Sequence, residues 1–464
     1  MVFCKTRQFG DVFRKRGNRL GHSVARWGLK CFIDWMPRVQ EREESPFLFS
    51  KNNLRDHPED RIERYHQSHN HLMATKSCIH RSLASRVPSI VWEQNSPLSM
   101  QIDTRKGEIS TRHGRFSGGA ADQVEVIEVD TGAIRVMILP TRGMSIWRME
   151  SSGVRFGWQS PIFGPVHPSQ VPIFDSSGIG WLEGFDELLV RCGLESNGAP
   201  EHDAEGNLIH PLHGRIGNLP ADSLTIEYDE ASGRLEVIGE VLESRLFVKR
   251  LRLRSRIRFE AGSSEVAVLD DVTNELSKPA SMQLLYHINV GAPILGAGAK
   301  LEAPIESLAP KDSHAASEMD TWNEFGAPEE GYAERVYFAR LRADESSATT
   351  AMLRSADGEK GLGITFNVNG LPRFILWKNT AAESDGYVTG LEPATNYPNA
   401  RSFEQKQGRT IELEGGATAS FRVKLMPLTT AEQVDEVSRQ IQVLQGDEDP
   451  EIHLQPRPGW SPGA

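Results

Sequence analysis

The stretch Arg250–Phe259 constrains the fold of this 464-residue chain more than any other. It reads Arg-Leu-Arg-Leu-Arg-Ser-Arg-Ile-Arg-Phe, so charged and mostly apolar side chains alternate throughout. Because successive side chains of a β-strand point to opposite faces of the sheet, this alternation predicts a strand with one buried face and one wet face. The arginines are most simply explained as the solvent face of a sheet and not as a groove for phosphate.

Further strand-like stretches follow one another from about Met100 onward. The turn Asp130-Thr-Gly132 lies between two of them and predicts a hairpin. One helix is predicted, at residues 431–444, which follow Thr429 and stop just before Gly446. The predicted strands are 124–129, 133–139, 224–228, 235–238, 264–272, 282–290, 336–341, 363–366, 374–378 and 420–425. Many short strands with almost no helix predict an all-β fold of the β-sandwich type.

Composition divides the chain into three parts. Residues 1–94 are rich in Arg, Lys and His and lack a regular apolar pattern, so we expect a disordered basic N-terminal extension. The alternative for this segment is an arm that binds nucleic acid or an anionic surface. Residues 95–446 carry the strand patterns and the helix, and they form the predicted β-sandwich domain. Residues 447–464 are rich in Pro and Gly and are expected to be a tail.

Charge and cysteine content exclude several classes of partner. The net charge of −11 argues against nucleic acid as a partner of the whole chain. No apolar run reaches the roughly 18–20 residues that a membrane span needs. The four cysteines form no Cys-x-x-Cys pair, which suits a reducing compartment. We therefore expect a cytoplasmic protein that binds neither nucleic acid nor membrane, as a monomer or homodimer.

Two strand-like stretches place an ionisable side chain where it could act in a site. Glu392 follows the apolar residues 388–391 and precedes Pro393, which favours an extended backbone at the glutamate. A carboxylate fixed at the end of a strand is a candidate base, and the alternative is a surface glutamate. His287 and Asn289 lie two residues apart in a predicted strand and therefore share one face. The alternative for His287 is a core histidine bonded to backbone.

His202, His210 and His213 form a cluster in the sequence. Two or three histidines with an acid could bind Zn²⁺. Their intervals are not those of a His-Glu-x-x-His helix, however, and Pro211 breaks any helix there. We favour an alternative in which His213-Gly-Arg215 forms a loop that binds a polar ligand, with Arg215 as a further candidate contact.

Aromatic and basic side chains supply the remaining candidates. Trp158 and Trp181 lie in a segment rich in Gly and Pro, and flat aromatic walls suit a ligand with apolar C–H faces. The alternative is that these tryptophans cap the core, and we expect one of the two to do so. Arg142, beside a turn, could donate several hydrogen bonds to the hydroxyl groups of a ligand or could form a surface salt bridge. Arg191 and Lys378 are further candidate substrate contacts.

His213, His287 and Glu392 follow one another in this order along a β-rich chain. In this respect the chain resembles the galactose mutarotase (aldose 1-epimerase) superfamily over roughly Ser96 to Leu444. More closely, the chain resembles the branch that carries Arg-Gly-Met-x-Ile and Cys-Gly-Leu motifs. These motifs are Arg142–Ile146 and Cys192–Leu194 here. Two positions depart from the mutarotase pattern. Thr141 stands where the mutarotases have the asparagine of an Asn-Arg pair. Tyr286 stands where they have an asparagine before the histidine that acts as the acid, which is His287 here. Both are substrate-contact positions in that superfamily, so the sugar need not be galactose or glucose.

The resemblance implies both a fold and a function. The fold would be a large, twisted antiparallel β-sandwich with a sugar cleft on a concave sheet face. The function would be interconversion of sugar anomers by general acid–base ring opening, with His287 serving the ring oxygen and Glu392 taking the anomeric proton. His213 and Arg142 would hold sugar hydroxyls, and no metal or organic cofactor would be needed. The rival functions are a non-catalytic carbohydrate-binding module and a metal-dependent sugar isomerase.

Overall fold

The alternating stretch Arg250–Phe259 forms most of β13 (Lys249–Glu260) in the computed structural model, which describes residues 88–462. Leu251, Leu253, Ile257 and Phe259 are buried, whereas the intervening arginines are half-buried or exposed. Those arginines form ion pairs with acidic side chains of the same sheet, such as Arg258 with Glu236. The prediction of a strand with one wet face is therefore confirmed.

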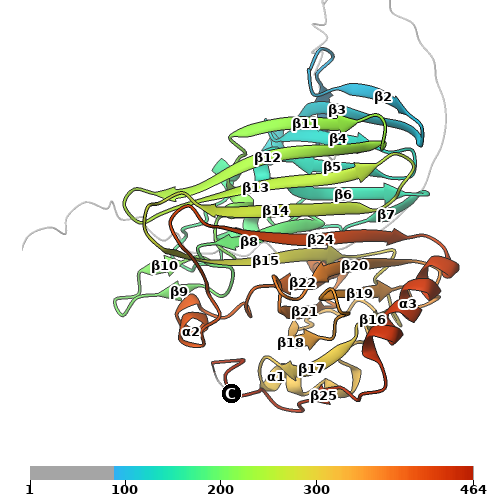
Figure 1. The fold of residues 1–464 in the computed structure, drawn as a ribbon. Helices are drawn as coiled ribbons and strands as arrows, with labels where there is room; N and C mark the ends of the chain where they lie inside the picture. Colours follow the sequence, from blue (N-terminus) through green and yellow to red (C-terminus); the bar gives the residue numbers. More distant parts are fainter. Residues whose placement is uncertain (1–87, 463–464) are drawn as a thin grey trace, which may run out of the picture. The chain divides into compact units, whose positions relative to one another are not determined.

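Two large antiparallel sheets build the β-sandwich (Figure 1). The strands of the larger sheet are β1 (Ser89–Trp92), β2 (Met100–Thr104), β3 (Gly107–Ser117), β4 (Glu125–Asp130), β5 (Arg135–Leu139), β6 (Ser145–Ser151), β7 (Val154–Phe156), β8 (Leu189–Leu194), β15 (Ala280–Val290), β17 (Ile305–Pro310), β18 (Arg335–Leu341), β21 (Arg373–Asn379), β22 (Val388–Ala394), β23 (Ile411–Leu413) and β25 (Glu451–Ile452). Its main path runs β1-β3-β4-β5-β6-β8-β15-β22-β21-β18-β17-β25, so β8, β15, β22 and β21 lie side by side at its centre.

The smaller sheet has eight strands in the order β11-β12-β13-β14-β24-β20-β19-β16. Besides β13, its strands are β11 (Ser223–Asp229), β12 (Arg234–Arg245), β14 (Val266–Asn274), β16 (Lys300–Glu302), β19 (Ala348–Arg354), β20 (Gly361–Asn367) and β24 (Thr418–Leu428). A separate two-stranded ribbon joins β9 (Glu201–His202) to β10 (Leu208–His210). The helices are α1 (Ser313–Ala316), α2 (Arg401–Lys406) and α3 (Ala431–Gln445).

The main core lies between the two sheets. Apolar side chains of both sheets, such as Ile146 and Val237, belong to one buried cluster. Along β15, Tyr286 and Ile288 face this core, whereas Leu285 belongs to a second apolar cluster on the opposite face of the larger sheet. Because strand side chains alternate, His287 shares the face of Leu285. The larger sheet is thus covered on both faces at its centre, and the second face carries the candidate site.

The ends of the domain differ from the boundaries expected at 95 and 446. β1 pairs with β3 before residue 95, and β25 pairs with β17 after residue 446. The ring of Trp460 also packs 4.9 Å from that of Tyr397, so the predicted tail is part of the fold. Short pairings at sheet edges leave little pattern in the sequence, which is why these ends were not predicted. Residues 1–87 of the predicted extension lie outside the described residues.

The predicted helix is confirmed as α3. Its N-cap is Thr430, one residue after the expected Thr429, and the Thr430 hydroxyl accepts a hydrogen bond from the backbone N–H of Gln433. Gly446 ends the helix as expected. Within residues 88–462 no helix is long and apolar enough to cross a membrane.

Candidate active site

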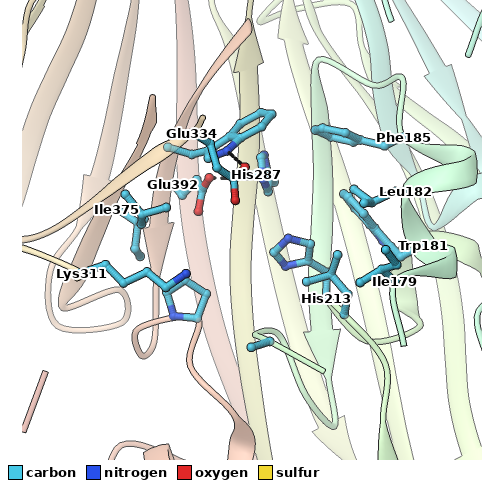
Figure 2. Close-up of a pocket in the computed structure, with 15 residues that line it drawn as sticks. Ile179, Trp181, Leu182, Phe185, His213, His287, Lys311, Glu334, Ile375 and Glu392 are labelled. Atoms are coloured by element: carbon cyan, nitrogen blue, oxygen red, sulfur yellow. Dashed lines mark hydrogen bonds and ion pairs between the residues drawn. The ribbon is translucent and has the colours of Figure 1, made fainter. Parts of the chain in front are cut away.

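A cavity of about 280 Å³ opens on the face of the larger sheet that lies away from the smaller sheet. Strands β15, β21, β22 and β18 supply its floor, and loops around residues 179–185 and 199–213 supply its walls (Figure 2). The lining residues are Ile179, Trp181, Leu182, Phe185, Ala199, Leu212, His213, His287, Lys311, Glu334, Val336, Ile375, Trp377, Glu392 and Pro398.

His287 and Glu392 are in direct contact in this cavity. The strand pairs Leu285–Ala394 and Ile288–Leu391 place the two residues opposite each other on β15 and β22. Nε2 of His287 lies 3.2 Å from Oε1 of Glu392, and both side chains are buried. Two residues 105 positions apart in the sequence are therefore joined by the register of one strand pair.

Gly390 makes room for this contact. A Cβ atom at this position would lie 2.5 Å from Oε1 of Glu392 and 3.1 Å from Cε1 of His287. Glycine inside a strand often marks a place where another group approaches closely. The missing side chain of Gly390 thus leaves space for the histidine and the carboxyl group to meet.

The hydrogen bonds around His287 assign its tautomer. Nδ1 of His287 lies 2.6 Å from Oδ1 of Asn289, and the amide nitrogen of Asn289 donates to the backbone carbonyl of Glu187 at 2.9 Å. Because Oδ1 can only accept a hydrogen bond, Nδ1 of His287 carries the proton. Nε2 of the neutral ring is therefore unprotonated and faces Glu392, so a proton on Glu392 would bridge the pair.

Burial shifts the pKa values of both groups towards their neutral forms. It raises the pKa of Glu392 well above its usual value, and Glu334 adds to the rise while Lys311 opposes it. Burial also lowers the pKa of His287 well below its usual value, and His213 lowers it further. Both shifts favour the state in which the proton shared between Nε2 of His287 and Oε1 of Glu392 lies on Glu392.

His213 is a neutral hydrogen-bond acceptor in the cavity wall. Its Nδ1 lies 2.9 Å from the carbonyl oxygen of Asn197, which assigns the proton to Nδ1 and leaves Nε2 free to accept. Burial lowers the pKa of His213 to about 4. The residue adopts a positive φ of 57°, a conformation that is concentrated at functional sites. Its ring lies 5.3 Å from that of His287 and 4.6 Å from that of Trp181.

Aromatic rings surround the two histidines. Phe185 and Trp377 lie 5.1 Å and 5.4 Å from the ring of His287 between centroids. Trp181, in a short 3-10 helix over Gly180–Gly184, packs 4.7 Å from Phe185. Figure 2 shows Trp181 and Leu182 on one side of the cavity, with Glu392 and Lys311 on the other. The side of Trp181 and Leu182 is thus mainly apolar, and the opposite side carries the ionisable Glu392 and Lys311.

Comparison with known proteins places the chain in a family. The profile of the family described as "Domain of unknown function (DUF4432)" matches residues 121–426. The chain belongs to this family. Among solved structures, a candidate aldose 1-epimerase from Klebsiella pneumoniae subsp. pneumoniae is 32% identical, with a TM-score of 0.73 over 80% of this chain and 95% of that chain. No curated protein matches the chain.

Other structures are more distant from this DUF4432 protein. A galactose mutarotase-like protein from Clostridium acetobutylicum is 13% identical, with a TM-score of 0.47 over 66% of this chain and 96% of that one. A galactose 1-epimerase from Lactobacillus acidophilus is 14% identical, with a TM-score of 0.45 over 68% of this chain and 97% of that one. The relative from Klebsiella confirms the predicted membership of the galactose mutarotase-like superfamily.

Arg142 of this DUF4432 protein lies outside the cavity lining. Its guanidinium is buried and donates to the carboxylate of Glu187, to Oδ1 of Asn218 and to the carbonyl oxygens of Val166 and Gly184. These bonds tie the walls of the site together from behind. Arg142 therefore holds these segments in place from outside the cavity, and the predicted direct contact with sugar hydroxyls does not agree with its position.

Arg191 lies on the other side of the sheet, between the two layers of the sandwich. It forms an ion pair with Asp270 of β14 and donates to Ser255 of β13, while the hydroxyl of Tyr286 donates to the same aspartate. A fully buried arginine in the core cannot reach the cavity. The side chain of Arg191 points from β8 towards the smaller sheet, so its position does not agree with the predicted substrate contact.

Of the two candidate tryptophans, one lines the cavity and the other packs behind its wall, as expected. Trp181 lines the cavity, whereas Trp158 is buried behind Phe185 and donates its indole N–H to the carbonyl oxygen of Glu187.

The last three candidates also lie outside the lining. Nζ of Lys378 donates to the carbonyl oxygen of Thr321, and the guanidinium of Arg215 lies over the ring of Phe174. Asn289 has no place in the cavity wall, but it orients His287 through the Nδ1 contact. Trp377, the neighbour of Lys378, lines the cavity instead because alternate residues of β21 face opposite sides.

The histidine cluster does not assemble a metal site. Nε2 of His202 contacts the carbonyl oxygen of Ser176 on an exposed loop, whereas His213 lies in the cavity. Within residues 88–462 no three His, Cys, Asp or Glu side chains gather in a way that could hold a metal ion. The geometry of these residues does not favour the metal-dependent alternative.

Sequence reasoning missed Lys311, Glu334 and Gly390. Lys311 directly follows β17 and Glu334 directly precedes β18, the strand that pairs with β17. Both positions lie at the ends of strands, where charged site residues are common, but no strand is predicted from the sequence between residues 290 and 336, where β17 lies. The signal for Gly390 was a glycine within a predicted strand.

Proposed function

We propose that this protein is an aldose 1-epimerase-like isomerase that interconverts the anomers of a free sugar. The observation that carries the proposal is the contact between His287 and Glu392, which places a proton donor and a proton acceptor 3.2 Å apart at the floor of a cavity. Mutarotation needs one acid and one base within reach of the ring oxygen and the anomeric hydroxyl of a sugar. These two oxygens are attached to the same carbon, so adjacent groups can serve both.

The pair can move protons without external supply. When the proton that the pair shares lies on Nε2 of His287, this histidine protonates the ring oxygen. At the same time the carboxylate of Glu392 removes the proton of the anomeric hydroxyl. The bond from C1 to the ring oxygen breaks, C1 becomes a carbonyl, and the pair again holds one proton. Rotation of the carbonyl and reversal of these steps close the ring as either anomer. Asn289 holds the His287 ring in the tautomer that this exchange requires.

The surroundings of the pair favour a monosaccharide. Flat aromatic walls suit the apolar C–H faces of a sugar ring, and neutral His213 offers an acceptor to a hydroxyl. The cavity of about 280 Å³ lies just below the ≈ 300–1,000 Å³ that small-molecule sites occupy, so it suits a ligand no larger than one sugar ring.

Anomer-exchange NMR on a panel of free aldoses tests the proposal. The wild-type protein should accelerate exchange between the α and β signals of at least one sugar, and Glu392→Gln should abolish most of the acceleration. Glu128→Gln is a matched control, since Glu128 is also buried on the larger sheet but lies in β4, outside the cavity. A wild type that binds a sugar but accelerates no exchange would make the protein a non-catalytic binding module.

A further inference from the structure

Lys311 is a cavity residue whose charge the proposed reaction does not use. Its backbone is fixed, because its N–H donates to the carbonyl oxygen of Val336 at 2.9 Å. Its side chain is half-buried and lines the cavity. Among residues 88–462 no hydrogen bond or ion pair engages its ammonium group. A partly desolvated ammonium without a partner is unfavourable, so the position calls for an anionic or strongly polar ligand group.

The other polar groups of the cavity have partners within the protein. Glu334 accepts a hydrogen bond from the indole N–H of Trp377 at 2.5 Å, and its side chain is exposed to solvent. Nδ1 of His213 donates to the carbonyl oxygen of Asn197, and only the neutral acceptor Nε2 is left for a ligand. Two buried lysines elsewhere in the described chain, Lys249 and Lys378, also have partners. The buried lysines Lys249 and Lys378 thus have partners within the protein, whereas the half-buried Lys311 presents its unpaired ammonium to the cavity.

The charge of Lys311 acts on the reacting groups. It lowers the pKa of Glu392 and of His213, so the ammonium lies close enough to both to influence them. Because His213 and the His287–Glu392 pair are held neutral, the ammonium is the positive charge that an incoming sugar meets beside them. Figure 2 shows Lys311 on the side of Glu392, across from Trp181.

There is room beside Lys311 for a substituent of the sugar. The residue also borders a second cavity of about 500 Å³, whose other lining residues are Asp312, Ser313, Gln455, Pro456, Ser461 and Pro462. A pyranose with its anomeric carbon at the His287–Glu392 pair has its C6 substituent beyond the ring oxygen. Such a substituent can point away from the aromatic wall towards the lysine.

We propose that the substrate is an acidic monosaccharide, a uronic acid, whose carboxylate Lys311 binds. The inference rests on the proposed anomer exchange and names the substrate class of the same site. A carboxylate is favoured over a phosphate because Lys311 is the single lysine or arginine among the lining residues. Phosphate groups in proteins are commonly held by a bidentate arginine or by several backbone N–H groups. A single ammonium matches a single negative charge, and the carboxylate of Glu334 in the same lining disfavours a second one.

The test compares acidic and neutral sugars of the same configuration. Anomer exchange is measured for galacturonate against galactose and for glucuronate against glucose. Galactose 6-phosphate is measured as well, because it carries about two negative charges where galacturonate carries one. A hydrogen bond to a charged group favours the acids by about ten- to a hundredfold in kcat/KM. Lys311→Met keeps the apolar stem and removes the charge, so the ratio of acid to neutral kcat/KM should fall by about the same factor. The ratio in the wild type should also fall as salt is added.

Lys406→Met is the matched control, since Lys406 is an exposed lysine of α2 outside the cavity, and it should leave the ratio unchanged. Equal rates for acids and neutral sugars, or an unchanged ratio in Lys311→Met, would overturn the inference while anomer exchange itself stands. A preference for the 6-phosphate over the uronate would also overturn it.

A wild type that exchanges no sugar would instead remove the proposed function. Uronate binding is then measured by ligand-observed NMR against the neutral sugar. Binding that Lys311→Met weakens would support the carboxylate site, and binding that it leaves unchanged would overturn it.

Discussion

Substitution of Gly390 by alanine should disable the site while leaving the fold in place. The new Cβ would lie 2.5 Å from Oε1 of Glu392, whereas ordinary contact begins at 3.4 Å. The difference, 3.4 − 2.5, requires the carboxyl group to move by about 0.9 Å. A misplacement of about 1 Å can cost about 10²-fold in rate, which corresponds to about 2.7 kcal/mol in the activation barrier.

The fold should tolerate the change because the closest atom is the end of a side chain. Gly390 does not have a positive φ, so alanine fits its backbone conformation. The overpacking should cost about 1–3 kcal/mol of stability. Gly363→Ala in β20 of the smaller sheet is a matched control, since its Cβ would lie 2.7 Å from the flexible methyl end of Met426 on the neighbouring strand β24.

Anomer-exchange NMR and thermal melting separate the two effects. We expect Gly390→Ala to lose about 10²-fold in kcat/KM, whereas Gly363→Ala should lose stability but little activity. A folded Gly390→Ala protein that exchanges anomers at the wild-type rate would refute the reasoning, because the carboxyl group could not then need the position that the glycine leaves open.

Three further predictions concern the proton that the pair holds. Glu392→Gln should reduce anomer exchange by about 10²–10⁴-fold, as measured by NMR, with a much smaller change in sugar affinity. The exchange rate should stay level across neutral pH, because the lowered pKa of His287 and the raised pKa of Glu392 widen the pH range over which the two groups share one proton. A pH–rate profile with a sharp change near pH 6.5 would contradict this. The melting temperature of Glu392→Gln should exceed that of the wild type by a margin that grows above pH 4.5. The reason is that Glu392 ionises there in the unfolded chain while the buried carboxyl group stays protonated, which destabilises the folded wild type. Melting temperatures of both proteins over a pH series measure this margin.

Local patterns in the sequence were sufficient to predict the class of fold. Alternation in 250–259 has the period of a strand wherever that strand lies, and the capping signals of α3 are contained within a few residues. The same holds for the shared face of His287 and Asn289, which follows from the strand period alone. The short edge strands β1 and β25 carried no such pattern, because two to four paired residues are too few to show a period.

The sequence by itself determined that a histidine and a glutamate stand on strands of a β-sandwich, because strand alternation and the effect of a following proline are local. Only the tertiary structure decided which side chains meet. The register of β15 against β22 brings His287 to Glu392, and the pairing of β17 with β18 carries Lys311 and Glu334 to the same cavity. Arg142, predicted to contact sugar, braces the loops instead, because its donors find acceptors that lie far away in the chain. Such partners depend on sheet order and loop paths, which no local pattern contains.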